Sequence, residues 1–165
     1  MATADLVHDP EENRLPLQRL RFLLGHFRGE GQYTKGTTIF YKETSGSWEA
    51  GGRFIGLRMN VIYPLADGRK DIHEALVMVG VGSTSEHFKA QAYTDGGTII
   101  NYQLELDGDA LSFADQPPTE HGSKGQRARK FLIPTGEGFE ERVDVDWGNG
   151  EFVPYSIVQM QKVRE

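Results

Sequence analysis

Apolar and polar residues alternate along most of the chain, from residue 27 to residue 163, with breaks only at turns. A period of two is typical of a β-strand with one face buried, because successive side chains point to opposite faces. The breaks are rich in Gly, Asp, Asn, Pro and Ser and carry no helical pattern, which favours hairpins between antiparallel neighbours. Ten segments share the alternation: 27–33, 39–50, 53–63, 72–82, 87–95, 98–106, 110–115, 127–135, 139–147 and 154–163.

Such a series predicts an all-β fold, either a sandwich or an up-and-down antiparallel β-barrel of about ten strands. Glycines inside the strands favour the barrel, because they mark bends or close backbone approaches. They recur at Gly29, Gly31, Gly56 and Gly80. We expect Gly29 and Gly31 to let the first strand bend sharply beside a helix that closes one end of the barrel.

Polar residues that share a strand face with apolar ones also favour a barrel. Gln159 is in phase with Ile157, Glu141 with Phe139, and Arg53 with the apolar residues that follow it. A dry sandwich core would be destabilised by these groups, whereas a hydrated cavity can solvate or pair them. The alternative is that each lies near a strand end and reaches solvent.

A short amphipathic helix is predicted ahead of the strands, in "LPLQRLRFLLG" (15–25). Leu17, Leu20 and Leu24 have i, i+3, i+7 spacing, and Pro16 suits a first helical turn. Residues 1–14 are polar and acidic without periodicity, which predicts a flexible N-terminal arm before a single barrel domain at 15–165.

Composition narrows the classes of function. The net charge of −6, from 18 basic and 24 acidic residues, disfavours a nucleic-acid partner. The absence of cysteine excludes disulfide scaffolds, cysteine-ligated metals and thiol nucleophiles. No signal-peptide pattern and no membrane-length apolar run occur, so we expect a cytoplasmic protein with no membrane partner.

Catalytic and metal-binding motifs give no signal. The five histidines lack chelating spacing, and His73 and Glu74 are strand neighbours that point to opposite faces. No nucleophile elbow or phosphate-binding loop is present. We therefore predict no metal site and name no catalytic residue.

Arginines and tyrosines are the candidates for contacting a ligand inside the barrel. An inward arginine with a nearby tyrosine would fix a carboxylate, because the guanidinium pairs with two oxygens. If Arg53 points inward, Met59 lines the cavity with it; Arg129 shares the face of Phe131. The alternative places the arginines on the outer surface. The full predicted lining is Tyr33, Tyr41, Glu43, Arg53, Met59, Tyr102, Arg129, Tyr155 and Gln159.

Three stretches resemble the calycin superfamily, which includes lipocalins, fatty-acid-binding proteins and nitrobindin-type barrels. They are "LLGHFRGEGQY", "WEAGGRFIGLRM" and "YTDGGTIINYQLELDGDALSF". The first resembles the superfamily's entry motif of a short helix followed by Gly-x-aromatic, with Phe27 where tryptophan is usual. Order and spacing resemble an uncharacterised bacterial branch, and the resemblance implies ligand binding in a barrel.

The resemblance also raises haem as a possible cofactor. Nitrobindin-type barrels bind haem through a histidine on the last strand, but "FVPYSIVQMQKV" has none. Tyr155 is the candidate iron ligand in that stretch, so the expectation is no cofactor, with haem as an alternative.

We therefore expect a carrier or sensor that binds a small, mostly apolar ligand, which could bear a carboxylate. A second hypothesis is a lyase or isomerase acting on a small acid. Phenolic acid decarboxylases, which are calycin-like barrels, use Tyr, Arg and Glu in the cavity, and Tyr41 and Glu43 share a face here. A third is an interaction domain, and pairing into a homodimer would suit a barrel of this size.

Overall fold

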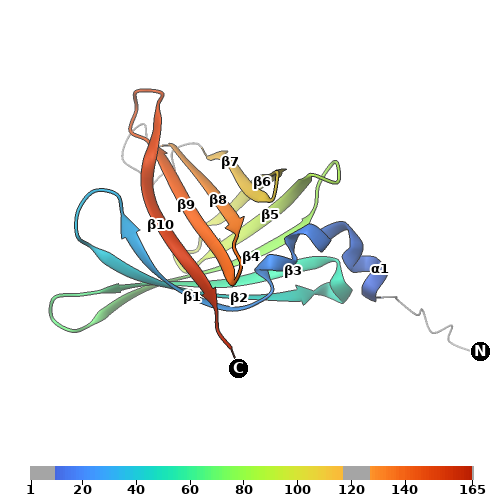
Figure 1. Cartoon of the computed structure of the whole chain (residues 1–165), viewed down its shortest axis with the longest axis horizontal. Helices are drawn as coiled ribbons and strands as arrows, with labels where there is room; N and C mark the ends of the chain where they lie inside the picture. The colour runs from blue at the N-terminus through green and yellow to red at the C-terminus, as the bar shows by residue number, and fades with distance from the viewer. Residues whose placement is uncertain (1–9, 117–126, 165) are drawn as a thin grey trace, which may run out of the picture.

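A computed structural model describes residues 10–116 and 127–164, and residues 1–9 of the predicted arm lie outside this range. Ten antiparallel strands form one closed barrel, as predicted, with a helical segment across one end (Figure 1). The elements are α1 (Pro10–Arg14), the 3-10 helix η1 (Leu15–Leu23), β1 (Gly25–Tyr33), β2 (Ile39–Glu49), the 3-10 helix η2 (Ala50–Gly52), β3 (Phe54–Pro64), β4 (Lys70–Val81), β5 (His87–Thr94), β6 (Ile99–Asp107), β7 (Ala110–Gln116), β8 (Arg127–Pro134), β9 (Gly138–Asp146) and β10 (Phe152–Lys162).

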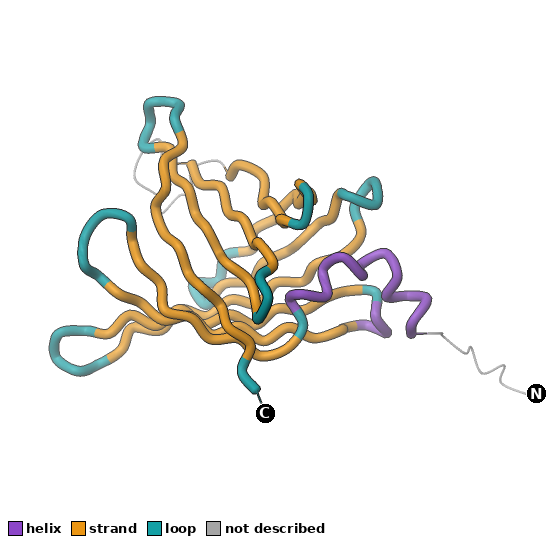
Figure 2. Tube along the Cα trace, in the orientation of Figure 1, coloured by secondary structure: helices purple, strands orange, loops and turns teal. Residues whose placement is uncertain are grey.

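Each strand pairs with the next one along the chain, and β1 closes the barrel by pairing with β10. The closing register runs from Phe27 opposite Lys162 to Tyr33 opposite Ser156. Figure 2 shows the strands wrapped around one interior, with the helices at one end and long hairpins at the other. Among the described residues, no helix has the length and apolar character needed to span a membrane.

The predicted helix is a 3-10 helix over most of its length. Leu17, Leu20 and Leu23 are fully buried, whereas Leu24 is only half-buried and lies past the end of η1. Burial at every third residue matches the three residues per turn of a 3-10 helix, so these leucines form one stripe. The preceding residues 10–14 form α1, where Asn13 Nδ2 donates to the carbonyl of Gly51 over 3.0 Å.

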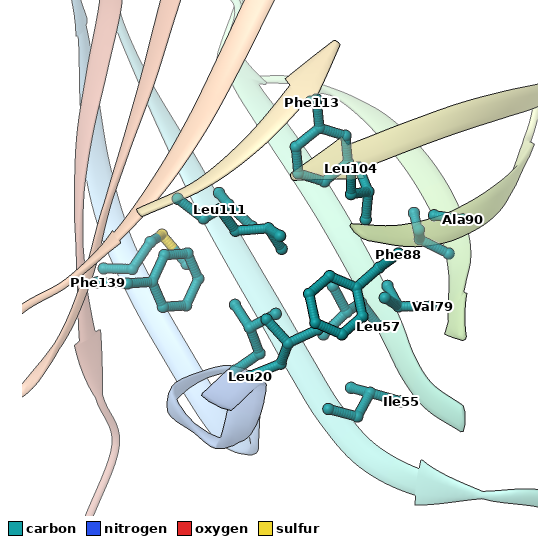
Figure 3. Close-up of a cluster of buried hydrophobic side chains, with 14 of the residues drawn as sticks. Leu20, Ile55, Leu57, Val79, Phe88, Ala90, Leu104, Leu111, Phe113 and Phe139 are labelled. Carbon is teal, nitrogen blue, oxygen red and sulfur yellow. The ribbon is translucent and has the colours of Figure 1, made fainter. Parts of the chain in front are cut away.

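The leucine stripe of η1 closes the end of the barrel by packing on inward side chains of the strands (Figure 3). Each fully buried leucine stabilises the fold by about 1.5–3 kcal/mol relative to exposure. The surrounding side chains are all buried and apolar: Phe27, Ile55, Leu57, Val79, Phe88, Leu104, Leu111 and Phe139.

Gly29 and Gly31 serve mainly to leave space inside the barrel. A Cβ on Gly31 would lie 2.3 Å from the ring of Phe40. One on Gly29 would lie 2.5 Å from the backbone oxygen of Gln159 and 2.8 Å from side-chain atoms of Val158 and Met160. Neither glycine has a positive φ. The two inward positions of β1 are therefore filled by side chains of its neighbours β2 and β10.

Gly46 plays a different part, because it lets η1 dock on the barrel wall. A Cβ at this position of β2 would lie 1.8 Å from the carbonyl oxygen of Leu23. The end of η1 therefore rests directly on the backbone of β2, with no side chain between them.

Candidate ligand site

A cavity of about 320 Å³ lies inside the barrel, further from η1 than the leucine-packed core. Along β3, Leu57 belongs to that core, while Met59 and Val61 line the cavity. The remaining lining residues come from β2, from β4 to β8 and from the turn after β5: Lys42, His73, Glu74, Ala75, Val77, Ala92, Thr94, Asp95, Ile100, Tyr102, Phe113 and Lys130.

Two larger hollows lie on the outside of the barrel. One, of about 760 Å³, runs along the end of η1 and the turn between β8 and β9. The other, of about 610 Å³, covers the outer face of β1 to β3 and β10. We place the candidate site in the smaller interior cavity because it lies inside the barrel, where its lining combines apolar side chains with a few polar and charged ones.

A buried ion pair spans the interior beside this cavity. The Nζ atom of Lys42 lies 2.6 Å from Oε1 and 2.5 Å from Oε2 of Glu141, and both residues are buried. They come from β2 and β9, which β1 and β10 separate. The Lys42 side chain therefore extends across β1, where Gly29 and Gly31 leave the inner face without side chains.

Two lysines influence the single carboxylate of Glu141. Burial by itself raises the pKa of Glu141, but the ammonium groups of Lys42 and Lys130 outweigh it and lower that pKa to about 2. Burial, together with the charge of Lys130, lowers the pKa of Lys42 despite its contact with Glu141. With Glu141 ionised, the cluster of Lys42, Lys130 and Glu141 has two ammonium groups and one carboxylate, which leaves one positive charge uncompensated within the cluster; the carboxylates of Glu74 and Asp95 lie at the edge of the cavity.

Lys130 carries that uncompensated charge. Its Nζ atom lies 5.5 Å from the ring centroid of Phe113, and the ring of Tyr102 lies 5.3 Å from the same ring. Within the described part of the chain, neither the Lys130 ammonium nor the Tyr102 hydroxyl forms a hydrogen bond or a close ion pair. Both groups thus retain donors in residues that line the cavity.

Tyrosines gather where the strands extend beyond the cavity. The Tyr33 hydroxyl donates to that of Tyr63 over 3.3 Å, and the ring of Tyr155 lies 5.1 Å from that of Tyr33. Burial raises the pKa of Tyr33 and of Tyr155, and their mutual contact contributes at Tyr155. These phenols therefore stay neutral and act as hydrogen-bonding groups.

Four of the nine predicted residues face the interior or its open end. Met59 and Tyr102 line the cavity. Tyr33 packs beneath Phe40 at the open end, with ring centroids 5.0 Å apart. Tyr155 lies beside it, next to an irregularity in the pairing of β10 with β9.

Tyr41, Glu43 and Gln159 lie on the outer face of the barrel, so their predicted place in the cavity is wrong. All three border the outer hollow of about 610 Å³. Glu43 pairs with Arg28 at 3.2 Å, and Gln159 Nε2 donates to a neighbouring glutamate of β9 over 2.6 Å. The even-numbered residues of β2 face inward, which turns Tyr41 and Glu43 outward.

The two predicted arginines also lie outside the cavity. Arg53 follows η2, before the first residue of β3, and is exposed. Arg129 lies on the outer face of β8, with its guanidinium 4.0 Å from the ring centroid of Phe152 and 3.5 Å from Asp144. Since Glu43 is also outside, the Tyr–Glu–Arg arrangement of the enzyme hypothesis is not assembled in the cavity.

The sequence prediction missed the two lysines, and for Glu141 it left open whether the side chain points inward or reaches solvent; the structure buries it. Lys42 shares its parity with Phe40 and Trp48, a signal that was present in the sequence. The signal for Lys130 was ambiguous, because β8 has apolar residues on both faces.

Tyr155 does not fit the role of a haem ligand in this structure. Tyr155 is the only residue on β10 that was considered as an iron ligand, and its ring packs against Tyr33 and Trp147 rather than into the cavity. Its raised pKa also opposes the phenolate that would ligate iron. Elsewhere in the described ranges, no three acidic or histidine side chains gather in a way that could hold a metal ion.

These features define the chain as a closed ten-stranded barrel with a partly charged internal cavity. Among solved structures, it is similar to the crystal structure of Rv2717c from M. tuberculosis, with a TM-score of 0.62 and 15% sequence identity. The match covers 90% of this chain and 98% of that one. At this identity, the likeness supports the fold alone. No protein-family model and no curated protein matches the chain.

Proposed function

We propose that this protein binds a small, mostly apolar ligand inside the barrel, as a carrier or sensor. The observation that carries the proposal is the interior cavity of about 320 Å³. Small-molecule sites typically occupy about 300–1,000 Å³, with a mostly apolar lining and a few polar groups. Met59, Val77, Ile100 and Phe113 supply apolar surface, and Tyr102 adds a hydroxyl.

The proposal includes a place among calycin-like barrels. It is supported by the three sequence stretches, by the helical plug before the first strand and by strand pairing in chain order. Because η1 fills one end of the barrel, a ligand would enter the cavity from the opposite end. This arrangement suits reversible uptake of a ligand from solution.

Filling the cavity should weaken ligand binding without unfolding the barrel. Ala92 lies on β5 with 4% exposure and lines the cavity, so Ala92→Phe would place a ring in the space. We expect its affinity for n-octanol or toluene to fall at least about tenfold, with a stability cost of about 1–3 kcal/mol from overpacking. Methyl NMR of Met59, Val61 and Val77 would report the binding.

Lys89→Phe is the matched control, because Lys89 lies three residues earlier on the exposed face of the same strand. This variant should bind the probes as the wild type does. Circular dichroism of both variants would show that the barrel is retained. If n-octanol, toluene and longer alkyl probes leave all three methyl signals of the wild type unchanged, the proposed function is wrong.

A further inference from the structure

We propose that the cavity contains an anion subsite at Lys130, so that the ligand class is a monocarboxylate with an apolar body. This inference rests on the proposed function and adds the chemistry of the ligand's polar end. It comes from the arrangement of Lys42, Glu141 and Lys130 on three strands of the barrel.

The first step is the count of charges in the interior. Glu141 is buried and holds the ammonium of Lys42 with both of its carboxylate oxygens. The charge of Lys130 acts on the same pair, lowering the pKa of each partner. Within this cluster one carboxylate cannot compensate two ammonium groups, and partial burial strengthens the attraction of Lys130 for a second anion. The carboxylate of a ligand would compensate the remaining positive charge.

The second step is to decide which lysine would hold the ligand. Lys42 is fully engaged by Glu141 and 4% exposed. Lys130 is half-buried and lines the cavity, and its ammonium has no close ion pair within residues 10–116 and 127–164. A lysine on its flexible stem offers three donors to an oxygen anion. Lys130 is therefore the group available to the ligand.

The third step concerns the rest of the ligand. Tyr102 and Lys130 flank the same ring of Phe113, so a hydroxyl donor and an ammonium both border this part of the cavity. The neighbouring lining is apolar, with Val61, Ile100 and Phe113. This combination matches a carboxylate joined to an alkyl or aryl body better than it matches a polyanion, which would need more donors.

The acidic lining residues favour one orientation of such a ligand. Asp95 accepts a hydrogen bond from the backbone N–H of Glu74 over 2.9 Å and lies 4.0 Å from His73 Nδ1. Both carboxylates are exposed at the edge of the cavity, while the lysines lie on β2 and β8. An anionic headgroup would be repelled by Glu74 and Asp95 and attracted by Lys130, so we expect the carboxylate to lie at Lys130.

Two probes of nearly equal size separate the anion subsite from apolar binding. Octanoate and n-octanol share the alkyl chain and differ in charge. In calorimetric titrations at neutral pH, the wild type should bind octanoate at least about tenfold more tightly than n-octanol, as expected for a charge-assisted hydrogen bond. Lys130→Met should remove that preference, so that octanoate binds this variant no more tightly than n-octanol does.

Two further variants make the result specific to Lys130. Lys130→Arg should restore most of the preference for octanoate, because it returns the positive charge. Lys89→Met removes a lysine from the outer face of β5 and should change neither affinity. Lys130→Met should fold, since the change also removes the repulsion between Lys130 and Lys42.

The failures of the two proposals are distinguishable. If the wild type binds octanoate no more tightly than n-octanol, or if Lys130→Met keeps the wild-type preference for octanoate, the cavity binds apolar ligands and the anion subsite is wrong. If Lys89→Met lowers the octanoate affinity as much as Lys130→Met does, the attraction is a general surface effect and the subsite is again wrong. If neither probe binds and the methyl signals stay unchanged, the proposed function fails and the inference fails with it.

Discussion

Replacing Glu141 with leucine is expected to lower the free energy of unfolding by about 3–5 kcal/mol, because Lys42 would remain buried without its counter-charge. Both residues are almost fully shielded from solvent, and the contact uses both carboxylate oxygens. Lys130 increases the cost, since its charge would then face Lys42 with no carboxylate nearby. Equilibrium unfolding in urea would measure the loss.

Lys42→Met is the matched single variant, and we expect it to cost less. Glu141 would keep the favourable charge of Lys130, whereas Glu141→Leu leaves two like charges together. The double variant Lys42→Met/Glu141→Leu should recover much of the loss, because apolar side chains of similar volume can replace a buried ion pair. Equal losses for the two single variants would contradict the charge imbalance that we infer.

The same carboxylate predicts the direction of the pH dependence. The pKa of Glu141 falls from an ordinary 4.5 to about 2 in the folded barrel, so the unfolded chain binds the proton first as the pH falls. The stabilising contribution is therefore complete above pH 4.5 and is lost progressively towards pH 2. The wild type should lose stability more steeply than Glu141→Gln across this interval, as urea unfolding at graded pH would show.

Gly46→Ala is the second change with a large expected effect. The added Cβ would lie 1.8 Å from the carbonyl oxygen of Leu23, and a backbone atom cannot yield as a flexible side chain can. The end of η1 would have to move away from β2, which would loosen the packing of the buried leucines. We expect a loss of about 3 kcal/mol or more, at or above the upper end for overpacked cores.

Gly136→Ala is the control for the Gly46 substitution. No atom lies within 4 Å of a Cβ at Gly136, and its φ is not positive. Alanine there should be neutral or should stabilise the fold by about 0.4–1 kcal/mol through the unfolded chain. Thermal unfolding of the two variants would test the prediction, and similar melting temperatures would show that the docking of η1 on β2 contributes little.

The ten strands and their order could be predicted from the sequence because a period of two is a local property. The alternation can be recognised in each segment separately, and the short turns between segments favour pairing of each strand with the next one along the chain. The helical plug was predicted as well, but its 3-10 form depends on how Leu17, Leu20 and Leu23 meet the barrel. That contact joins residues far apart in the sequence.

The site residues were harder to predict because the inward face of a strand depends on where the strand begins. In β2, apolar residues occupy both odd and even positions. The prediction took Tyr41 rather than Phe40 as inward-facing, and this exchanged the inner and outer faces of the strand. The prediction for Arg53 failed for a different reason, because Arg53 caps η2 and lies before the first residue of β3. The ion pair of Lys42 with Glu141 joins strands separated by two others, so no local pattern could reveal it.

The pairing of β1 with β10 has a consequence for biosynthesis. When β1 to β9 have left the ribosome, the free edge of β1 still lacks its partner, because residues 152–162 emerge after the other nine strands. An unpaired edge strand can recruit the edges of other nascent chains. The outward charges of Arg28 and Glu30 disfavour such contacts. They would keep the unfinished barrel from pairing with its neighbours on a polysome until its own last strand arrives.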